Sequence, residues 1–243
     1  MREDIIIVTG ASRGIGAAIS LRLAQAGTLV ACMSRSGTLP EGASEADSGR
    51  LIPFVADVTD AEAVRTAIAA AVDGRRLLGI VNNAGLHTEA RSSELSIDDW
   101  NGQISANATS VLIGCQAAYP HLRGEGGLII NIGSFFDKLG VKRNLAYCAS
   151  KAAVGAMTRV LAVEWGRDGI AVIDVAPGYI VTSLNREGME QGPLRAYLEK
   201  RIPGGAPGDA DDVARLVAGL FAMDVRFLNG ETIYLDGGQG IAH

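Results

Sequence analysis

Residues 4–16 read DIIIVTGASRGIG, a run of mostly branched apolar residues that passes directly into a glycine-rich turn. The continuous run at 4–9 is typical of a parallel strand buried on both faces, because a half-solvated strand alternates apolar and polar residues. From Gly14 to Ala26 the apolar residues recur at helical spacing, and Gly27 then supplies a helix stop signal. The stretch therefore predicts a strand, a turn and a helix in succession.

The same alternation of strands and helices continues along the chain. Helices between strands imply right-handed crossovers and a mostly parallel sheet. We therefore expect an α/β fold in which residues 1–243 form a single domain, a Rossmann-like, doubly wound parallel sheet flanked by helices. Further strands are expected at 29–33, 51–55, 77–81, 128–132, 171–175 and 232–235, and further helices at 61–72, 147–165 and 210–223 and from about Ser96 onward.

The composition excludes several classes of protein. Of the 243 residues, 48% are hydrophobic and 20% are charged, which excludes intrinsic disorder. The net charge of −5 argues against a general binder of nucleic-acid backbones. The sequence has no apolar run of membrane-spanning length and no signal-peptide core. We expect no nucleic-acid partner and no membrane partner.

The cysteines and histidines form no pattern that binds a metal or builds a disulfide framework. Cys32, Cys115 and Cys148 are far apart and odd in number, and no two histidines have metal-ligand spacing. His87 is expected to be an ordinary loop histidine, with a place at the border of the substrate site as the alternative. Unpaired thiols are typical of a reducing compartment, so we expect a cytoplasmic protein without a metal site.

Two stretches interrupt the regular pattern. Residues 36–49 are rich in Gly, Ser, Ala and Glu, which is typical of a surface loop. Residues 183–209 contain several Gly and Pro around a short amphipathic piece at about 194–202. Because insertions of this length in compact domains are often lids, we expect a substrate lid at about 183–209. A solvated surface excursion is the alternative.

The glycine-rich turn at 9–16 lies where a dinucleotide-binding fold holds a pyrophosphate. Exposed backbone N–H groups and the start of the following helix attract an anion there, and glycine lets the backbone approach it closely. A glycine cluster alone fits a tight structural turn equally well. Its position directly after a buried strand favours the phosphate-binding interpretation.

Polar residues also follow two later strands. The sequence Asn-Asn-Ala-Gly at 82–85 ends the strand at 77–81, beside the expected switch point of the sheet, although an Asx turn would explain it too. Ser134 precedes Tyr147 by thirteen residues, and Lys151 comes four residues later. This i, i+4 spacing puts Tyr147 and Lys151 on one helix face. An interfacial tyrosine beside a solvated lysine is the alternative.

Together these motifs resemble the short-chain dehydrogenase/reductase family. The similarity covers essentially the whole chain. Within the family, the sequence is similar to the single-domain 3-oxoacyl-carrier-protein reductases and related carbonyl reductases. It implies a dinucleotide-binding and catalytic domain and an oxidoreductase, without naming a substrate. The residues that carry it stand in the family's order and spacing: Thr9-Gly10-x-x-x-Gly14-x-Gly16, Asn82-Asn83-Ala84-Gly85, Asn107, Ser134, Tyr147-x-x-x-Lys151, Pro177-Gly178-x-x-x-Thr182 and the terminal Gly230-Glu231-Thr232 with Asp236-Gly237-Gly238.

The resemblance implies a role for each residue of a catalytic group. Tyr147 would exchange a proton with the carbonyl or alcohol oxygen, and Ser134 would hydrogen-bond that oxygen. Lys151 would bind the nicotinamide ribose, and its charge would favour the phenolate of Tyr147. Asn107 would order a water that relays protons, whereas an asparagine inside a helix is alternatively exposed to solvent.

The second strand bears on the choice of nicotinamide cofactor. The sequence Met33-Ser34-Arg35 has no acid where an NAD-binding chain holds the ribose 2′-hydroxyl, and Arg35 and Arg13 would bind a 2′-phosphate. We therefore expect NADP(H) in preference to NAD(H), with two solvated arginines as the alternative. By resemblance the cofactor-binding residues are Gly10, Ser12, Arg13, Gly14, Ile15, Gly16, Ser34, Arg35, Asp57, Val58, Asn83, Ala84, Gly85, Tyr147, Lys151, Pro177, Gly178, Ile180 and Thr182.

The expected function is an NADP-dependent oxidoreductase that transfers a hydride between nicotinamide and a ketone or secondary alcohol. A catalytically silent NADP-sensing regulatory protein on the same fold is the alternative, but it has no chemical need of Ser134, Tyr147 and Lys151. A sugar-nucleotide epimerase or dehydratase would need a substantial C-terminal substrate domain, and only 65 residues follow Gly178.

The substrate is expected to be a small molecule in an apolar cavity. The segment Phe135-Phe136-Asp137-Lys138 departs from the small, Gly-rich segment common in 3-oxoacyl-carrier-protein reductases, which puts an acyl-carrier substrate in doubt. The basic residues between Ser134 and Tyr147, which are Lys138, Lys142 and Arg143, leave an acidic substrate or carrier as the alternative. Lining residues expected from the family are Phe135, Phe136, Leu145, Tyr179, Leu184 and Met189, with packing in the core as the alternative.

The family commonly forms tetramers, so the resemblance implies a homo-oligomer and most simply a tetramer. The contacts would involve the helices expected at 97–118 and 147–165 and the C-terminal strand region. Small residues that would permit close helix approach are Ala152, Ala153, Ala156 and Ala162, although small residues also suit packing onto the sheet.

Overall fold

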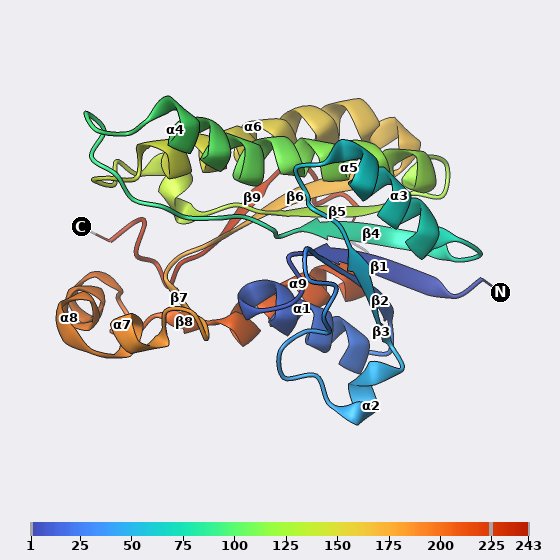
Figure 1. The fold of residues 1–243 in the computed structure, drawn as a ribbon, viewed down its shortest axis with the longest axis horizontal. Coiled ribbons are helices and arrows are strands. Elements are labelled where there is room, and N and C mark those ends of the chain that lie inside the picture. Colours follow the sequence, from blue (N-terminus) through green and yellow to red (C-terminus); the bar gives the residue numbers. More distant parts are fainter. Residues whose placement is uncertain (1, 224–225, 243) are drawn as a thin grey trace.

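The centre of the protein is a seven-stranded parallel sheet with helices on both faces (Figure 1). The structure is a computed structural model, and it describes residues 2–223 and 226–242. The strand order is β3-β2-β1-β4-β5-β6-β9, so the chain reverses direction across the sheet between β1 and β4, and the predicted doubly wound parallel sheet is confirmed. The strands are β1 (Asp4–Thr9), β2 (Leu29–Ser34), β3 (Leu51–Val55), β4 (Arg76–Asn82), β5 (Gly127–Ile132), β6 (Ile170–Pro177) and β9 (Thr232–Leu235).

The helices form one layer on each face of the sheet. In Figure 1, α3, α4, α5 and α6 cover one face, and α1, α2 and α9 cover the other. The helices are α1 (Gly14–Gln25), α2 (Glu45–Ser48), α3 (Ala61–Val72), α4 (Ile97–Ile104), α5 (Ser110–Leu122), α6 (Leu145–Trp165), α7 (Arg186–Glu190), α8 (Gly192–Arg201) and α9 (Ala210–Met223). No helix in the described part of the chain is both long and apolar enough to cross a membrane.

The apolar run of β1 has a direct structural cause. Ile5 and Ile7 pack in the core under the α3, α5 and α6 layer, whereas Ile6 and Val8 pack in the core under α1 and α9. Successive side chains of a strand point to opposite faces, and both faces here are covered. The strand that decides the fold is therefore apolar at consecutive positions.

The helix predicted from Ser96 onward differs from a regular α-helix. The Ser96 hydroxyl accepts from the Asp99 N–H and caps α4 as expected, but a π-helical turn, η1 (Ser105–Thr109), separates α4 from α5. A π-turn inserts one residue into the helix and often occurs at functional sites. This turn carries Asn107 into a fully buried position.

Buried polar side chains join the middle of the sheet to the helices above it. Asn82 Nδ2 donates to Asn131 Oδ1 at 2.9 Å, and Asn131 Nδ2 donates to Thr158 Oγ1 at 2.9 Å. Gly114 on α5 lies so close that a Cβ there would stand 2.1 Å from Asn82 Oδ1. This chain of hydrogen bonds fixes α5 and α6 against β4 and β5.

The two irregular stretches contain more structure than the sequence indicates. Residues 36–49 are mainly loop, as predicted, but include the single turn α2, which Ser44 and Asp47 stabilise as a capping box. The predicted lid at 183–209 holds α7 and α8 and the short strand β8 (Gly208–Asp209), which pairs with β7 (Ile180–Val181). Figure 1 shows α7 and α8 projecting beyond the carboxyl-end edge of the sheet.

Candidate active site

The residues predicted for the site lie at the carboxyl ends of the parallel strands or on helices beside that edge. The turns after β1 and β4 meet there through Thr9. Its hydroxyl accepts from the N–H groups of Asn83 and Ala84 at 3.0 and 3.1 Å, and Asn83 Nδ2 donates to the Thr9 carbonyl at 2.9 Å. These bonds hold the glycine-rich turn against the segment 83–85, at the switch point where such sheets bind ligands.

The glycines of the turn are required by close approach. Gly10 has φ +65°, and a Cβ on it would lie 2.9 Å from Ala84 Cα. A Cβ on Gly16 would lie 2.3 Å from the Gly10 carbonyl oxygen. Gly14, with φ +58°, begins α1 beside the side chain of Thr182. The cradle therefore presents backbone N–H groups at a helix start and fits a pyrophosphate.

Much of the predicted site lines one cavity of about 240 Å³. The cavity lies between the glycine-rich turn, the end of β5 and the first turns of α6, so it connects the glycine cradle to Tyr147. Its lining comprises the predicted residues Ile15, Asn83, Gly85, Asn107, Ser134, Tyr147, Lys151, Pro177 and Gly178, together with Leu86, His87, Ile132 and Gly133.

Tyr147 stands in the first turn of α6, which begins two residues earlier than predicted. Burial raises the pKa of its phenol above the ordinary value, and hydrogen bonding with Ser134 acts in the opposite direction. The expected phenolate stabilisation by Lys151 is therefore not the dominant effect in the free protein, because Lys151 Nζ lies 5.7 Å from the centroid of the ring. The phenol keeps its proton near neutral pH.

Lys151 is almost completely enclosed, with 5% of its surface exposed. Its Nζ donates to the Ile132 carbonyl at 2.7 Å. Burial lowers the pKa of the ammonium to about 8, and the charge of Asp174 acts in the opposite direction. Most Lys151 side chains are therefore charged at neutral pH, but the pKa lies close enough to neutral pH that a small further fall would discharge them.

Ser134 and Asn107 are held by hydrogen bonds that fix their positions. The Ser134 hydroxyl accepts from Phe136 N–H at 3.3 Å at the start of the short 3-10 helix η2 (Phe135–Lys138). Asn107 Oδ1 accepts from Leu86 N–H, and its Nδ2 donates to the Leu86 carbonyl, both at 2.8 Å. Nδ2 also lies 3.2 Å from Ser150 Oγ. Asn107 is therefore buried, not solvent-exposed, and it secures the segment after β4 beside the cavity.

Several of the predicted cofactor-binding residues lie at or near the end of β2. Ser34 is buried, whereas Arg13 and Arg35 are exposed and have no ion-pair partner among the described residues. Asp57 accepts hydrogen bonds from Thr59, which lower the pKa of its carboxyl. The remaining predicted residues are Ser12 in the glycine-rich turn, Val58 after β3, Ile180 on β7, and Thr182 beside Gly14.

Glu41 is a residue of this region that the sequence analysis missed. Its Oε1 accepts from the Gly14 N–H at 2.6 Å, and both carboxylate oxygens accept from Ser183 Oγ at 3.0 Å. A carboxylate therefore occupies the start of α1, where an anion is most favourable. The position of this glutamate depends on the path of the loop 36–49, which no sequence pattern specifies.

His87 is also closer to the site than expected. Its ring lies 4.6 Å from the Tyr147 ring, centroid to centroid, and its Nε2 is hydrogen-bonded to Asn144 Oδ1. Its place two residues after Gly85 was the available signal in the sequence. His87 forms one wall of the cavity beside the phenol.

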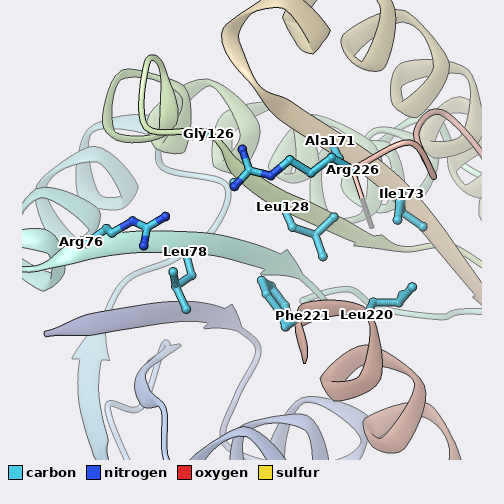
Figure 2. Close-up of a pocket in the computed structure, with 10 residues that line it drawn as sticks. Arg76, Leu78, Gly126, Leu128, Ala171, Ile173, Leu220, Phe221 and Arg226 are labelled. Atoms are coloured by element: carbon cyan, nitrogen blue, oxygen red, sulfur yellow. The ribbon is translucent and has the colours of Figure 1, made fainter. Parts of the chain in front are cut away.

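A second cavity of about 180 Å³ lies at the opposite edge of the sheet. Arg76 and Arg226 flank it, and Leu78, Leu128 and Phe221 are among its walls (Figure 2). The strands begin at this edge, so the cavity is remote from Ser134 and Tyr147, which lie at the edge where strands end. It takes no part in the site described above.

Comparison with known proteins agrees with this geometry. The profile described as enoyl-(acyl carrier protein) reductase matches residues 10–239. The chain belongs to the short-chain dehydrogenase/reductase family, which confirms the predicted family and an enzyme of the oxidoreductase class. The family uses nicotinamide cofactors. In the described part of the chain, no group of three or more His, Cys, Asp or Glu side chains is placed to hold a metal.

Relatives with different substrates resemble the chain to similar degrees. It is 36% identical to 3beta-hydroxysteroid dehydrogenase 1 of Eggerthella lenta, over 98% of this chain and 94% of the relative. It is 33% identical to D-threitol dehydrogenase of Mycolicibacterium smegmatis, over 98% and 93%. Among solved structures, ElxO with NADP bound superposes with a TM-score of 0.90 and 28% identity, over 98% of this chain and 99% of that one.

The Glu41 contact predicts an effect on dinucleotide binding. We expect Glu41→Gln to bind a nicotinamide dinucleotide about two- to tenfold more tightly, because the pyrophosphate no longer competes with a carboxylate for the Gly14 N–H. Isothermal titration calorimetry measures the difference. Ser183→Ala removes the contact to Glu41 but keeps the charge, so it is the control and should change affinity less. Unchanged or weaker binding by Glu41→Gln would contradict the expectation.

Proposed function

We propose that this protein is an NADP(H)-dependent oxidoreductase that transfers a hydride between nicotinamide and a ketone or secondary alcohol. The observation that carries the proposal is the shared cavity of Ser134, Tyr147 and Lys151 next to the glycine cradle. The bound nicotinamide supplies or accepts the hydride. Tyr147 gives its proton to the carbonyl oxygen in reduction, and Ser134 hydrogen-bonds that oxygen as charge develops. Lys151 binds the nicotinamide ribose, and Asn107 orders a water molecule that relays protons.

A catalytically silent NADP sensor is not favoured. The site encloses an ammonium and a phenol whose pKa values burial shifts in opposite directions. Such shifts are typical of groups that exchange protons, whereas ligand binding alone does not require them. The relatives described above are also named as dehydrogenases.

The substrate is proposed to be a small, partly apolar carbonyl or alcohol. Phe136 packs edge-on against Tyr147 with 6.0 Å between ring centroids, and Tyr179 lies 5.6 Å from Phe135. Leu145 and Leu184 are largely exposed, so of the predicted lining they contribute least to an enclosed wall. We propose that the segment 183–209, with Met189 packed inside it, closes over the substrate as a lid.

A carrier-protein substrate is less consistent with the basic residues near the cavity. Lys138 Nζ stacks 3.4 Å from the centroid of the Tyr234 ring, and Arg143 pairs with Glu89 at 3.8 Å. Their charges are therefore engaged within the chain. A small diffusible substrate is the proposal. The free cysteines support a reducing, cytoplasmic compartment as part of it.

The first prediction from this proposal concerns the proton donor. Tyr147→Phe should bind NADPH like the wild type but reduce ketones about 10²- to 10⁴-fold more slowly, because only the exchangeable proton is lost. Steady-state rates over a panel of ketones, with NADPH binding measured in parallel, test it. Tyr119→Phe, on α5 and hydrogen-bonded to Asp168, is the matched control and should keep full activity. Near-normal turnover by Tyr147→Phe would refute the mechanism.

The second prediction concerns cofactor choice. Arg35→Ala should weaken NADP binding about ten- to a hundredfold and leave NAD binding nearly unchanged, because a charge-assisted bond contributes roughly 1.5–3 kcal/mol. Ser34→Asp with Arg35→Ala should invert the preference by repelling the 2′-phosphate. Fluorescence titration of both cofactors measures it, with Arg65→Ala on the exposed face of α3 as control. A wild type that prefers NAD would show that Arg13 and Arg35 are ordinary surface residues.

We also propose that the chain assembles as a homotetramer. Val160 and Val163 on α6 are 55% and 83% exposed, and Ile97 at the start of α4 is 72% exposed. Ala152 and Ala156 lie on the same exposed face of α6. Ala162 is buried and Ala153 is partly covered, so these two alanines do not offer the surface for helix approach that the sequence predicted. Exposed apolar residues on these helices favour a subunit interface.

The assembly predicts a change in molecular mass. Val163→Asp should split the tetramer into smaller species at micromolar concentration, because a carboxylate is costly at an apolar interface. Light scattering coupled to gel filtration detects the change. Leu184→Asp, which alters an exposed leucine outside these helices, should leave the mass unchanged. A monomeric wild type would refute the assembly.

A further inference from the structure

Asp174 on β6 is a fully buried carboxylate that the proposed reaction does not use. Its neighbours across the sheet are Asn131 on β5 and Thr232 on β9. Thr232 Oγ1 lies 3.2 Å from Asp174 Oδ2 and donates to it, whereas Oδ1 has no hydrogen-bond partner among the described residues. Burying such a group is costly unless a charge or a hydrogen bond compensates. The surroundings must therefore supply another source of stabilisation.

The chain makes room for this carboxylate with two glycines. A Cβ on Gly133, directly after β5, would lie 2.3 Å from Asp174 Oδ1. A Cβ on Gly155 would lie 3.6 Å from Oδ2. Gly155 is four residues after Lys151 on α6, and residues at this spacing share one helix face. The carboxylate thus lies against the face of α6 that carries Lys151.

The peptide group that joins Ile132 to Gly133 is next to both the ammonium and the carboxylate. Lys151 Nζ donates to the carbonyl of Ile132, and the next residue, Gly133, packs against Asp174. Asp174 has no exposed surface, and Lys151 has 5%. Opposite charges enclosed in this way attract each other more strongly than at the surface, because little water screens them, and each acts on the pKa of the other.

We propose that Asp174 is the buried counter-ion of Lys151, a positioning residue that keeps the lysine protonated where it meets the cofactor ribose and the phenol of Tyr147. This inference rests on the proposed roles of Lys151 and Tyr147 for its functional meaning. The attraction between the two buried charges does not depend on those roles.

The titration behaviour of the pair supports this. Burial raises the pKa of Asp174 to about 6, and Lys151 acts against that rise. Burial lowers the pKa of Lys151 to about 8, and Asp174 acts against that fall. Between these values both groups are charged. Below about 6 the carboxylate takes up a proton and the ammonium loses its partner, whereas above about 8 the ammonium itself loses its proton.

Other ionisable groups face the pair from the surrounding elements. Asp137 on η2 raises the pKa of Asp174 by charge repulsion. The charge of Asp174 also raises the pKa of Tyr234 on β9, and the charge of Arg159 on α6 acts against that rise. Tyr147 lies beside Lys151, and the His87 ring is tilted at 58° against the ring of Tyr147. Because these neighbouring groups can also affect the pH dependence of activity, a direct titration of Lys151 is a sharper test than an activity profile alone.

The composition makes such a titration simple. The sequence contains four lysines, Lys138, Lys142, Lys151 and Lys200, and the structure exposes all of them except Lys151. NMR of lysine labelled with ¹³C and ¹⁵N therefore gives four side-chain signals in the free protein, and Lys151→Arg assigns the buried one. We expect Asp174→Asn to lower the pKa of Lys151 by about one unit, since removal of an adjacent opposite charge has this size.

Thr232→Val is the matched control. It removes the hydrogen bond to Asp174 but keeps the carboxylate charge, so it should leave the Lys151 pKa within a few tenths of the wild-type value. The alkaline limb of kcat/KM for ketone reduction should move to lower pH by the same unit in Asp174→Asn and remain in place in Thr232→Val. An unchanged Lys151 pKa in Asp174→Asn, or an equal shift in both variants, would overturn the proposal.

Wild-type protein provides a test that needs no variant of Asp174. The Lys151 signals should show a second inflection near pH 6, where Asp174 takes up its proton, and His87→Asn should retain it. A single inflection in the wild type would overturn the proposal even if Asp174→Asn does not fold. Because these signals are read without cofactor or substrate, a failure of the counter-ion is distinguishable from a failure of the proposed reaction, which would show only as absent turnover.

Discussion

The hydroxyl of Thr9 is the contact on which the geometry of the site depends. It accepts two backbone N–H groups from the end of β4, and the Asn83 side chain returns a bond to the Thr9 carbonyl. These bonds join the two halves of the doubly wound sheet where the strand order reverses. With this join in place, Gly10 and Gly16 stand within contact distance of the opposite segment, and α1 begins with its N–H groups directed to the crevice. The cradle and the cavity of Ser134, Tyr147 and Lys151 are continuous because this one join brings their supports together.

Burial shifts the pKa values of Tyr147 and Lys151 in the cavity, and of Asp174 outside its lining, more than the charges of these groups shift one another. It raises the pKa of the Tyr147 phenol, lowers that of the Lys151 ammonium and raises that of the Asp174 carboxyl. The free protein therefore holds the phenol in its protonated form, which is the form that can donate to a carbonyl oxygen. A bound nicotinamide that carries positive charge would add a cation beside the phenol and favour the phenolate. In the proposed reaction, Tyr147 would therefore be ready to donate a proton in the free protein and to accept one beside the oxidised cofactor.

Most of the fold and the composition of the cavity follow from local patterns in the sequence. The apolar run of β1 reflects two covered faces, and the polar residues after β1, β4 and β5 meet because parallel strands end at one edge. The π-turn at Ser105–Thr109 was not predictable, since one inserted residue scarcely alters the apolar spacing of a helix. Glu41 reaches Gly14 through a loop whose path depends on tertiary contacts. Asp174 did leave a signal, a single acid within the buried strand Ile170–Pro177, but its relation to Lys151 requires the register of three strands.

The segment 183–209 has a small hydrophobic core that is separate from the two cores of the sheet. Met189, Leu198 and Ile202 form that core with Tyr179, Val181 and Leu194, and none of these belongs to the two cores that flank the sheet. Substitutions of Met189, Leu198 or Ile202 therefore act mainly on the packing of this segment and little on the two cores that flank the sheet. Because the packing is separate, a change of residue in α7 or α8 has little effect on the strands. A sheet whose cores are packed independently of α7 and α8 favours the evolution of new specificities through few mutations in those helices, with little loss of stability.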